Sequence, residues 1–332
     1  MNPAESSLLS LITTPALLLR GDQIYFANPM AIDLLGGHIV GQDVRVAIRI
    51  PEALAVILGD AGGEARVDGL SVPGSVWKLA CHRLADGQRL VLLEDRSVRA
   101  SVARAHADFV ANASHELRTP LASILGYVET LANPAAGDDK ETRDKFLATI
   151  EHEARRMQAL VEDLMSLSRM EATKHEAPSQ AVDMVVLIKE SVGEQVDAAR
   201  IRLNIGAQRA IVAGDKGQLA QALRNLIDNA LKYGGSDTMV DVSLELSPQG
   251  RVLVTIADKG AGIAPEHLPR LTERFYRVDA GRSRAAGGTG LGLAIVKHIV
   301  ERHRGRLDLS SELGAGTTAT IILPSDKNFL SQ

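Results

Sequence analysis

The feature that most limits how this chain can fold is a pair of apolar stripes in residues 98–174, a segment with few helix breakers outside the cluster 133–139. In both stripes apolar residues recur at alternating spacings of three and four, which places them on one face of a helix. The stripes comprise Leu117, Leu121, Ile124, Val128 and Leu131, and then Leu147, Ile150, Ala154, Met157, Val161 and Leu164. The short connection predicts an antiparallel hairpin. Because a hairpin cannot bury a full core alone, we expect two copies to form a four-helix bundle, and hence a homodimer.

The residues before the stripes predict a small α+β domain. Runs of strand length are "ALLL", "QIYFAN", "SVWKLACHRL" and "RLVLLED", and glycines lie in or near the turns between them. Two short helices are predicted for "PMAIDLLG" and "PEALAVILGD". This order of strands and helices over residues 1–97 resembles a PAS domain, which implies a sensory role. A plain folded module is the alternative.

The residues after the stripes predict an α/β sandwich. Helices are expected for "MVVLIKESVGEQV", "QLAQALRNLIDNALKY" and "GLGLAIVKHIVERHRG". Strands are expected for "VDVSLELS", "RVLVTIADKG", "RLDLSS" and "TTATIILP". Such a mixture predicts an antiparallel sheet covered by helices.

Composition excludes several classes of protein. The 332 residues carry a net charge of −4, which is not the basic footprint of a nucleic-acid binder. The single cysteine, Cys81, excludes an intrachain disulfide and a multi-cysteine zinc site. The apolar run 7–20 is too short to span a membrane and contains Thr13, Thr14 and Pro15. We therefore expect a cytoplasmic chain without a transmembrane segment, and recruitment by a membrane-associated partner stays open.

A polar face on the helix around residue 225 suggests a site for a metal and phosphates. Asn225, Asn229 and Lys232 recur at spacings of four and three, so they share one side of the helix. The apolar residues from Leu223 to Leu231 occupy the opposite side. Two carboxamides and an ammonium suit hydrated Mg²⁺ with phosphates, because Mg²⁺ prefers oxygen ligands and retains waters. A solvated polar face is the alternative.

Two glycine-rich motifs follow. In "DKGAGI" (258–263) Asp258 can accept a hydrogen bond from an adenine amine, while Gly260 and Gly262 let the backbone approach the base. "GGTGLGLAI" (287–295) opens a helix, whose N-terminus favours anionic phosphate. The second motif lacks the lysine of a P-loop and does not follow a strand, as a dinucleotide motif should.

The order of these motifs is diagnostic. An asparagine helix, DxGxG, "RFYRVD" and "GTGLGL" follow one another, and the chain here resembles the nucleotide-binding domain shared by histidine kinases, gyrase, heat-shock chaperone ATPases and mismatch-repair ATPases. With "SHELRTPL" upstream, residues 100–325 resemble sensor histidine kinases. The wording around that histidine is most similar to the phosphate-regulon sensor kinase subgroup.

This resemblance implies roles for individual residues. Mg²⁺ would be bound by Asn229, with Asn225 on the same face. Lys232 and Tyr233 would face the phosphates of ATP, and Asp258 would bind adenine.

The same family pattern describes a lid over the nucleotide. Arg277 would reach the γ-phosphate, and Phe275 would pack beside the lid. Segment 279–287 is expected to be mobile without nucleotide. The end of the lid would be formed by Gly288, Thr289, Gly290, Leu291 and Gly292.

The histidine motif supplies the second half of the expected chemistry. A neutral imidazole is a good nucleophile, so His115 would attack the γ-phosphorus of ATP. Glu116 would accept the proton that the ring loses. The resemblance implies that Thr119 helps to place the water that removes phosphate from the partner. Pro120 cannot donate a backbone hydrogen bond, so the helix is expected to bend there.

Together these features predict an ATP-dependent protein histidine kinase with three domains. The expected domains are a PAS-like sensory domain (1–97), a dimerisation and phosphotransfer domain (98–175) and an ATP-binding domain (176–327). The phosphoryl group on His115 would pass to an aspartate of a response regulator receiver domain. Two alternatives stay open: a signalling scaffold that binds nucleotide without phosphotransfer, and a plain ATPase of the chaperone type.

Overall fold

The computed structural model describes residues 9–85, 87–133, 139–172, 177–235, 237–278 and 288–326. The chain divides into two compact units, Met1–Val110 and Ala111–Gln332. Among the described residues, no helix is both long enough and apolar enough to cross a membrane.

The first unit is a five-stranded antiparallel sheet with strand order β2-β1-β5-β4-β3. Its strands are β1 (Ala16–Arg20), β2 (Gln23–Ala27), β3 (Gly63–Asp68), β4 (Val76–Arg83) and β5 (Arg89–Asp95). Between β2 and β3 lie α2 (Pro29–Leu35), η1 (Gly37–Ile39), α3 (Val44–Ala47) and α4 (Pro51–Leu58). The predicted strands and both predicted helices are present. Strand β3 was not predicted, because "GEARVD" has too few apolar residues to stand out from a turn.

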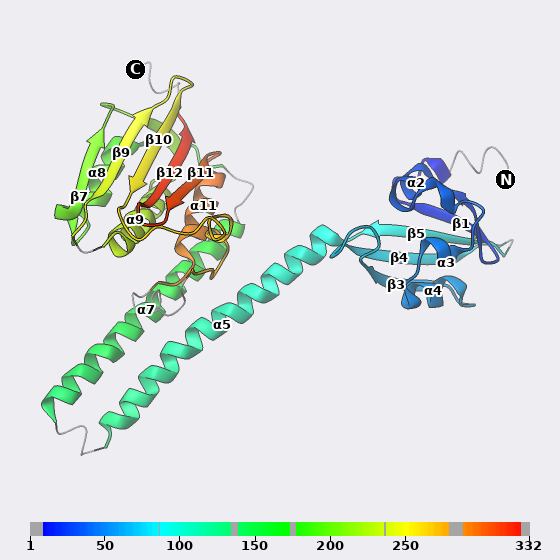
Figure 1. Ribbon diagram of the computed structural model, residues 1–332, viewed down its shortest axis with the longest axis horizontal. Helices are drawn as coiled ribbons and strands as arrows, with labels where there is room; N and C mark the ends of the chain where they lie inside the picture. Colours follow the sequence, from blue (N-terminus) through cyan, green and yellow to red (C-terminus); the bar gives the residue numbers. More distant parts are fainter. Residues whose placement is uncertain are drawn as a thin grey trace. The chain divides into compact units, whose positions relative to one another are not determined.

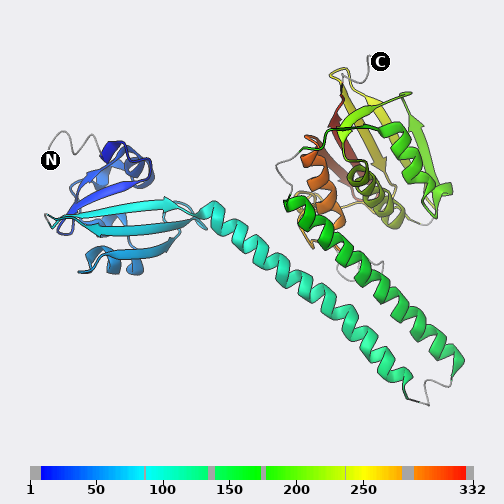
Figure 2. The same ribbon diagram turned by 180° about the vertical axis from the view of Figure 1, so that it is seen from behind.

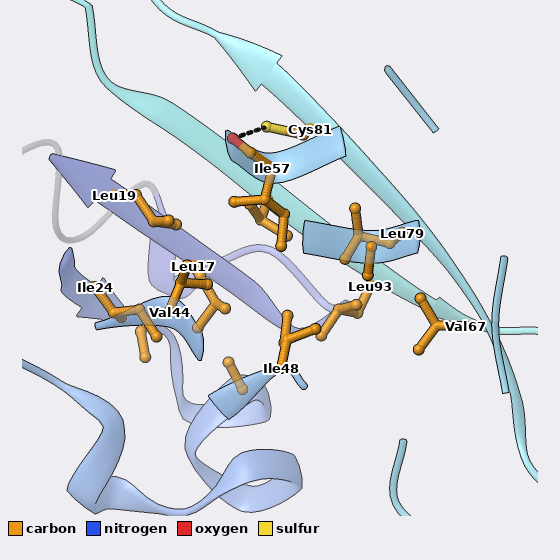
Figure 3. Packing of buried hydrophobic residues seen from close by; sticks show 14 of the residues in the cluster. Leu17, Leu19, Ile24, Val44, Ile48, Ile57, Val67, Leu79, Cys81 and Leu93 are labelled. Carbon is orange, nitrogen blue, oxygen red and sulfur yellow. Dashed lines mark hydrogen bonds between the residues drawn. The ribbon is translucent and has the colours of Figure 1, made fainter. Parts of the chain in front are cut away.

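The core of the first unit lies between one face of the sheet and these short helices (Figure 3). Leu79 of β4 and Leu93 of β5 pack against Ile48 and Ile57 from the helical segment, and all four are fully buried. Cys81 is buried in the same cluster as a free thiol, next to the carbonyl of Ile57. The alternation of buried residues along β4 and β5 therefore specifies which face is covered.

Two long helices form the predicted hairpin. Helices α5 (Ser97–Leu131) and α7 (Lys140–Ala172) run side by side in both views (Figures 1 and 2). Near the connection the rings of Tyr127 and Phe146 pack with centroids 5.0 Å apart. Helix α5 continues through Pro120 without interruption.

The apolar stripes of the hairpin are only half covered within one chain. Leu117 and Ile124 on α5 are half-buried, as are Ile150 and Met157 on α7. The alternate stripe positions are exposed, with exposed fractions of 46% for Leu121, 49% for Val128, 50% for Leu147 and 46% for Val161. Both helices of the hairpin thus leave apolar side chains exposed.

The C-terminal part of the second unit is an α/β sandwich. Its main sheet has the order β11-β12-β10-β9-β7. The strands are β7 (Ile201–Ile205), β9 (Val240–Leu246), β10 (Arg251–Ala257), β11 (Arg306–Glu312) and β12 (Gly316–Pro324). One face is covered by α8 (Met184–Gly193), α9 (Lys216–Tyr233) and α11 (Gly292–Arg302), which lie in front of the sheet in Figure 2. Smaller elements are β6 (Gln180–Asp183) paired with β8 (Ile211–Gly214), η2 (Ala198–Arg200) and η3 (Leu268–Arg270).

The expectation of a purely antiparallel sheet is wrong at one edge. Strand β7 pairs with β9 in parallel, with Ile201 opposite Val240. The connection between them includes β8 and α9, and such a crossover returns the chain in the same direction. Strand β7 was not predicted, because the alternating pattern of "IRLNI" covers only five residues.

Candidate functional site

A cavity of about 680 Å³ lies between α9, the end of β10 and the start of α11. It brings together motifs from three distant parts of the sequence. The predicted residues that line it are Asn225, Asn229, Lys232, Tyr233, Asp258, Gly262, Arg277, Gly288, Thr289, Gly290 and Gly292. Gly260, Phe275 and Leu291 adjoin these segments without lining the cavity.

Helix α9 presents its polar face to the cavity because its other face is buried. The carboxylate of Asp215 caps the helix by accepting a hydrogen bond of 3.0 Å from the N–H of Gln218. The buried face comprises Leu219, Ala222, Leu223, Leu226, Ile227 and Ala230. Asn225, Asn229 and Lys232 are half-buried on the cavity side. This orientation follows directly from the amphipathic pattern.

Asp258 is held by two backbone donors. Its Oδ1 accepts hydrogen bonds from the N–H of Gly260 at 2.8 Å and of Thr317 at 3.3 Å. Burial raises the pKa of the Asp258 carboxyl, and these two N–H groups offset part of that effect. With Oδ1 occupied in this way, Oδ2 is the oxygen that can accept from a ligand in the cavity.

The glycines of the DxGxG motif are required by close backbone packing. A Cβ at Gly260 would overlap the carbonyl oxygen of Tyr233. A Cβ at Gly262 would overlap the carbonyl oxygen of Glu312, and Gly262 also has a φ of +69°, which side chains rarely adopt. Gly260 therefore contributes by letting β10 end close to α9, although it does not line the cavity.

The two ends of the predicted lid contact each other. The N–H of Phe275 donates to the carbonyl of Gly290 at 2.8 Å, and Gly290 has a φ of +74°. Leu291 is fully buried. The predicted mobile segment 279–287 lies outside the described residues.

The histidine motif lies on α5, apart from the cavity lining. The ring of His115 is exposed, and the hydroxyl of Thr119 donates to the carbonyl of His115 at 3.2 Å. Oε2 of Glu116 accepts from Arg156 of α7 at 3.1 Å and from Arg277 at 2.9 Å. The side chains of both arginines are only 8% exposed. The structure thus joins Glu116 to Arg277, two residues for which the sequence predicts different roles in the same step.

Asp163 was not predicted from the sequence. This residue of α7 lines the cavity, and its Oδ2 accepts from the hydroxyl of Thr289 at 2.8 Å. Burial raises the pKa of the Asp163 carboxyl. One turn later the hydroxyl of Ser166 donates to Gln221 of α9 at 2.9 Å. A single aspartate in a charged helix carries no motif, so no sequence signal pointed to it.

The comparisons with known families agree with this geometry. Residues 105–173 match the His Kinase A (phospho-acceptor) domain. Residues 214–327 match the family described as histidine kinase-, DNA gyrase B- and HSP90-like ATPase. The chain therefore belongs to the sensor histidine kinases.

The chain is similar to two sensor kinases in particular. The chain is 41% identical over 238 residues to the phosphate regulon sensor protein PhoR of Pseudomonas aeruginosa, a match that covers 70% of this chain and 53% of PhoR. It is 36% identical over 263 residues to the sensor-like histidine kinase SenX3 of Mycolicibacterium smegmatis, with 77% and 66% covered. The chain thus spans less than two thirds of the length of these relatives.

One solved structure resembles the fold along nearly the whole chain. It is the histidine kinase ThkA, crystallised in complex with the response regulator protein TrrA. The TM-score is 0.56 at 18% identity, and the match covers 96% of this chain and 98% of ThkA. At this identity the likeness concerns the fold alone.

Proposed function

We propose that the protein is an ATP-dependent histidine kinase that phosphorylates its own His115 and passes the phosphoryl group to an aspartate of a response regulator receiver domain. The observation that carries this proposal is the cavity in which the asparagine helix, the DxGxG motif and the lid glycines converge, in a chain that also presents an exposed histidine in a phosphoacceptor domain. Removal of phosphate from the regulator is proposed as a second activity, with Thr119 placing the water.

The chemical step is a displacement at the γ-phosphorus. A ring nitrogen of neutral His115 forms the new N–P bond while the bond to the bridging oxygen breaks and ADP leaves. The other ring nitrogen becomes more acidic and passes its proton to Glu116. The products are phosphohistidine, ADP and a protonated carboxyl group, so atoms and charge balance.

Nucleotide binding is assigned to the cavity residues. Oδ2 of Asp258 would accept the adenine amine, and Lys232 and Tyr233 would face the phosphates. The amide oxygen of Asn229, with Asn225 beside it, fits a hydrated Mg²⁺ shared with phosphate oxygens. When bound, Mg²⁺ would neutralise charge on the transferring group.

The contact between Glu116 and Arg277 implies a rearrangement before transfer. In the arrangement described, the proposed base and the proposed γ-phosphate ligand neutralise each other at 2.9 Å. Phosphotransfer needs Arg277 on the nucleotide and Glu116 beside the histidine. We therefore infer that Arg277 exchanges Glu116 for the γ-phosphate when ATP binds.

The remaining assignments concern the assembly. The exposed half of the two apolar stripes supports a homodimer, because a second copy would cover it. The strand order β2-β1-β5-β4-β3, with helices between the second and third strands, supports a PAS-like sensory role for residues 1–97. We retain residues 98–175 as the dimerisation and phosphotransfer domain and 176–327 as the ATP-binding domain, and we propose that the chain works in the cytoplasm, where a membrane-associated partner could recruit it.

Incubation with γ-labelled ATP tests the proposal. Acid-labile label on the wild-type protein, absent from His115→Ala, is the expected result. The variant should bind ATP normally, because His115 lies outside the cavity. Bound ATP without label would indicate a scaffold, and free phosphate without labelled protein would indicate a plain ATPase. Label that persists on His115→Ala would refute the choice of phosphoacceptor.

A further inference from the structure

Helices α9 and α11 are joined by polar contacts at two separated points. The first joins Asp215, which caps the start of α9, to His303, which follows the last turn of α11. The second joins Asn225 of α9 to Gly292, at the start of α11, through a hydrogen bond of 3.3 Å from the amide of Asn225 to the carbonyl of Gly292. The start of α9 thus lies at the end of α11, so the helices are antiparallel.

The spacing of the two contacts matches along both helices. Asp215 and Asn225 are ten residues apart, and Gly292 and His303 are eleven apart. At 1.5 Å per residue these separations are roughly 15 and 16 Å. Two matched contacts of this kind fix how far α11 can slide or turn on α9. The contact between Asn225 and Gly292 lies at the cavity, while the contact between Asp215 and His303 lies at the far end.

His303 is built into the far contact. It is only 3% exposed, and its Nε2 accepts from the backbone N–H of Asp215 at 2.9 Å. Its Nδ1 lies 2.7 Å from the carbonyl oxygen of Ile299, so Nδ1 carries the proton and donates. Both bonds together require the neutral ring. The ring also packs on Gly214, where a Cβ would come within 2.9 Å of Cδ2 of His303.

We propose that His303 is a positioning residue for nucleotide binding: it sets the register of α11 on α9 and thereby holds the asparagine face opposite the glycines of the lid. This inference rests on the proposed nucleotide site. His303 does not line the cavity, so it can affect ATP binding only through the packing of α11 on α9. Loss of the Nε2 acceptor leaves the part-buried N–H of Asp215 without its partner and frees the far end of α11.

Two substitutions separate this role from general stability. In His303→Gln the side-chain oxygen can take the place of Nε2 and accept from Asp215. In His303→Asn the shorter amide reaches only the position of Nδ1, so the contact with α9 is lost. We expect the Kd for ATP to stay within about twofold of wild type for Gln and to rise roughly tenfold or more for Asn, the scale of one lost hydrogen bond.

A matched control removes the effect of stability. Val252→Ala opens a cavity in β10 at a fully buried position that takes part in neither of the two polar contacts between α9 and α11. It should lower the melting temperature and leave the Kd for ATP unchanged. If the Gln and Asn variants bind ATP equally well, or if Val252→Ala loses as much ATP affinity as His303→Asn at an equal fall in melting temperature, the inference is overturned. If wild type itself binds no ATP, the proposed function fails instead.

The pH dependence gives a second readout. Burial lowers the pKa of the His303 imidazole. The hydrogen bond to the Ile299 carbonyl and then the Asp215 carboxylate oppose this shift, and Arg302 adds a smaller lowering of the pKa. The neutral ring thus stabilises the fold above the ordinary histidine pKa of about 6.5, and this contribution is lost as the pH falls. ATP titrations at pH 7.5 and at progressively lower pH should show affinity falling more for wild type than for His303→Gln, whose amide does not titrate. Parallel curves for the two proteins would contradict the proposed role of the neutral ring.

Discussion

Replacing Asp258 by asparagine changes the hydrogen-bonding character of a single atom in the cavity. The new side-chain oxygen can keep both backbone bonds, from Gly260 and Thr317, because these donors need an acceptor. The amide nitrogen then takes the place of Oδ2. A hydrogen-bond donor consequently faces the adenine amine, which is also a donor.

The expected loss of affinity follows from the lost bond. A hydrogen bond to a charged group contributes about 1.5–3 kcal/mol. The Kd for ATP should therefore rise roughly 10- to 150-fold in Asp258→Asn. Inosine triphosphate carries an oxygen where adenine carries the amine, so the variant should bind it better than wild type does. The preference for ATP over inosine triphosphate should become smaller or reverse.

Stability should move in the opposite direction from affinity. The folded-state pKa of Asp258 is raised, so the ionised carboxylate disfavours folding at neutral pH. The protonated form of Asp258 stabilises the fold fully below the pKa that this group has in the unfolded chain. This stabilisation is lost as the pH rises through the pKa of the group in the folded protein. Asp258→Asn should thus melt at the same temperature as wild type or higher at pH 7, with a smaller difference near pH 4.

Isothermal titration with both nucleotides and a thermal melt at the two pH values test this. An ATP Kd within threefold of wild type, or an unchanged preference for ATP over inosine triphosphate, would refute the assignment of Asp258 to adenine. A large fall in melting temperature at pH 7 would instead show that the carboxylate supports the fold.

Three further substitutions address the phosphoryl end of the site. Thr119→Ala should slow dephosphorylation of the regulator roughly tenfold, the scale of one hydrogen bond, with little change in autophosphorylation; equal loss of both rates would mean that the residue only supports the helix. Asn229→Asp should weaken Mg²⁺-ATP binding about tenfold, because a carboxylate would face phosphate oxygens in a poorly screened site. Nucleotide titration with and without Mg²⁺ measures this change. Unchanged binding with normal autophosphorylation would move the metal assignment to Asn225. Glu116→Gln should slow autophosphorylation by roughly a hundredfold, because the base is lost. The same substitution releases Arg277 for the γ-phosphate, so it should tighten the binding of ATP but not the binding of ADP. Equal effects on the two nucleotides would contradict the proposed exchange.

Periodicity predicted the elements whose patterns are local. Apolar residues at alternating spacings of three and four predicted the hairpin of α5 and α7. The polar face of α9 predicted which side-chain groups line the cavity. The short strands β3, β6, β7 and β8 were missed, because their apolar runs are brief or broken by charged residues. Their positions depend on pairing with strands that are distant in sequence, and pairing energy leaves little trace in a short window.

The sequence by itself determined the class of the protein, because each motif needs particular residue types at fixed spacings: an imidazole beside a carboxylate, amides four residues apart, and glycines where backbones approach. Only the tertiary structure decided which motifs contact one another. The pairs Glu116 with Arg277, Asp163 with Thr289, and Asp215 with His303 join segments far apart along the chain. Each depends on how helices and strands pack in three dimensions, since a hydrogen bond is sensitive to a few tenths of an ångström. No local pattern of residues carries that information.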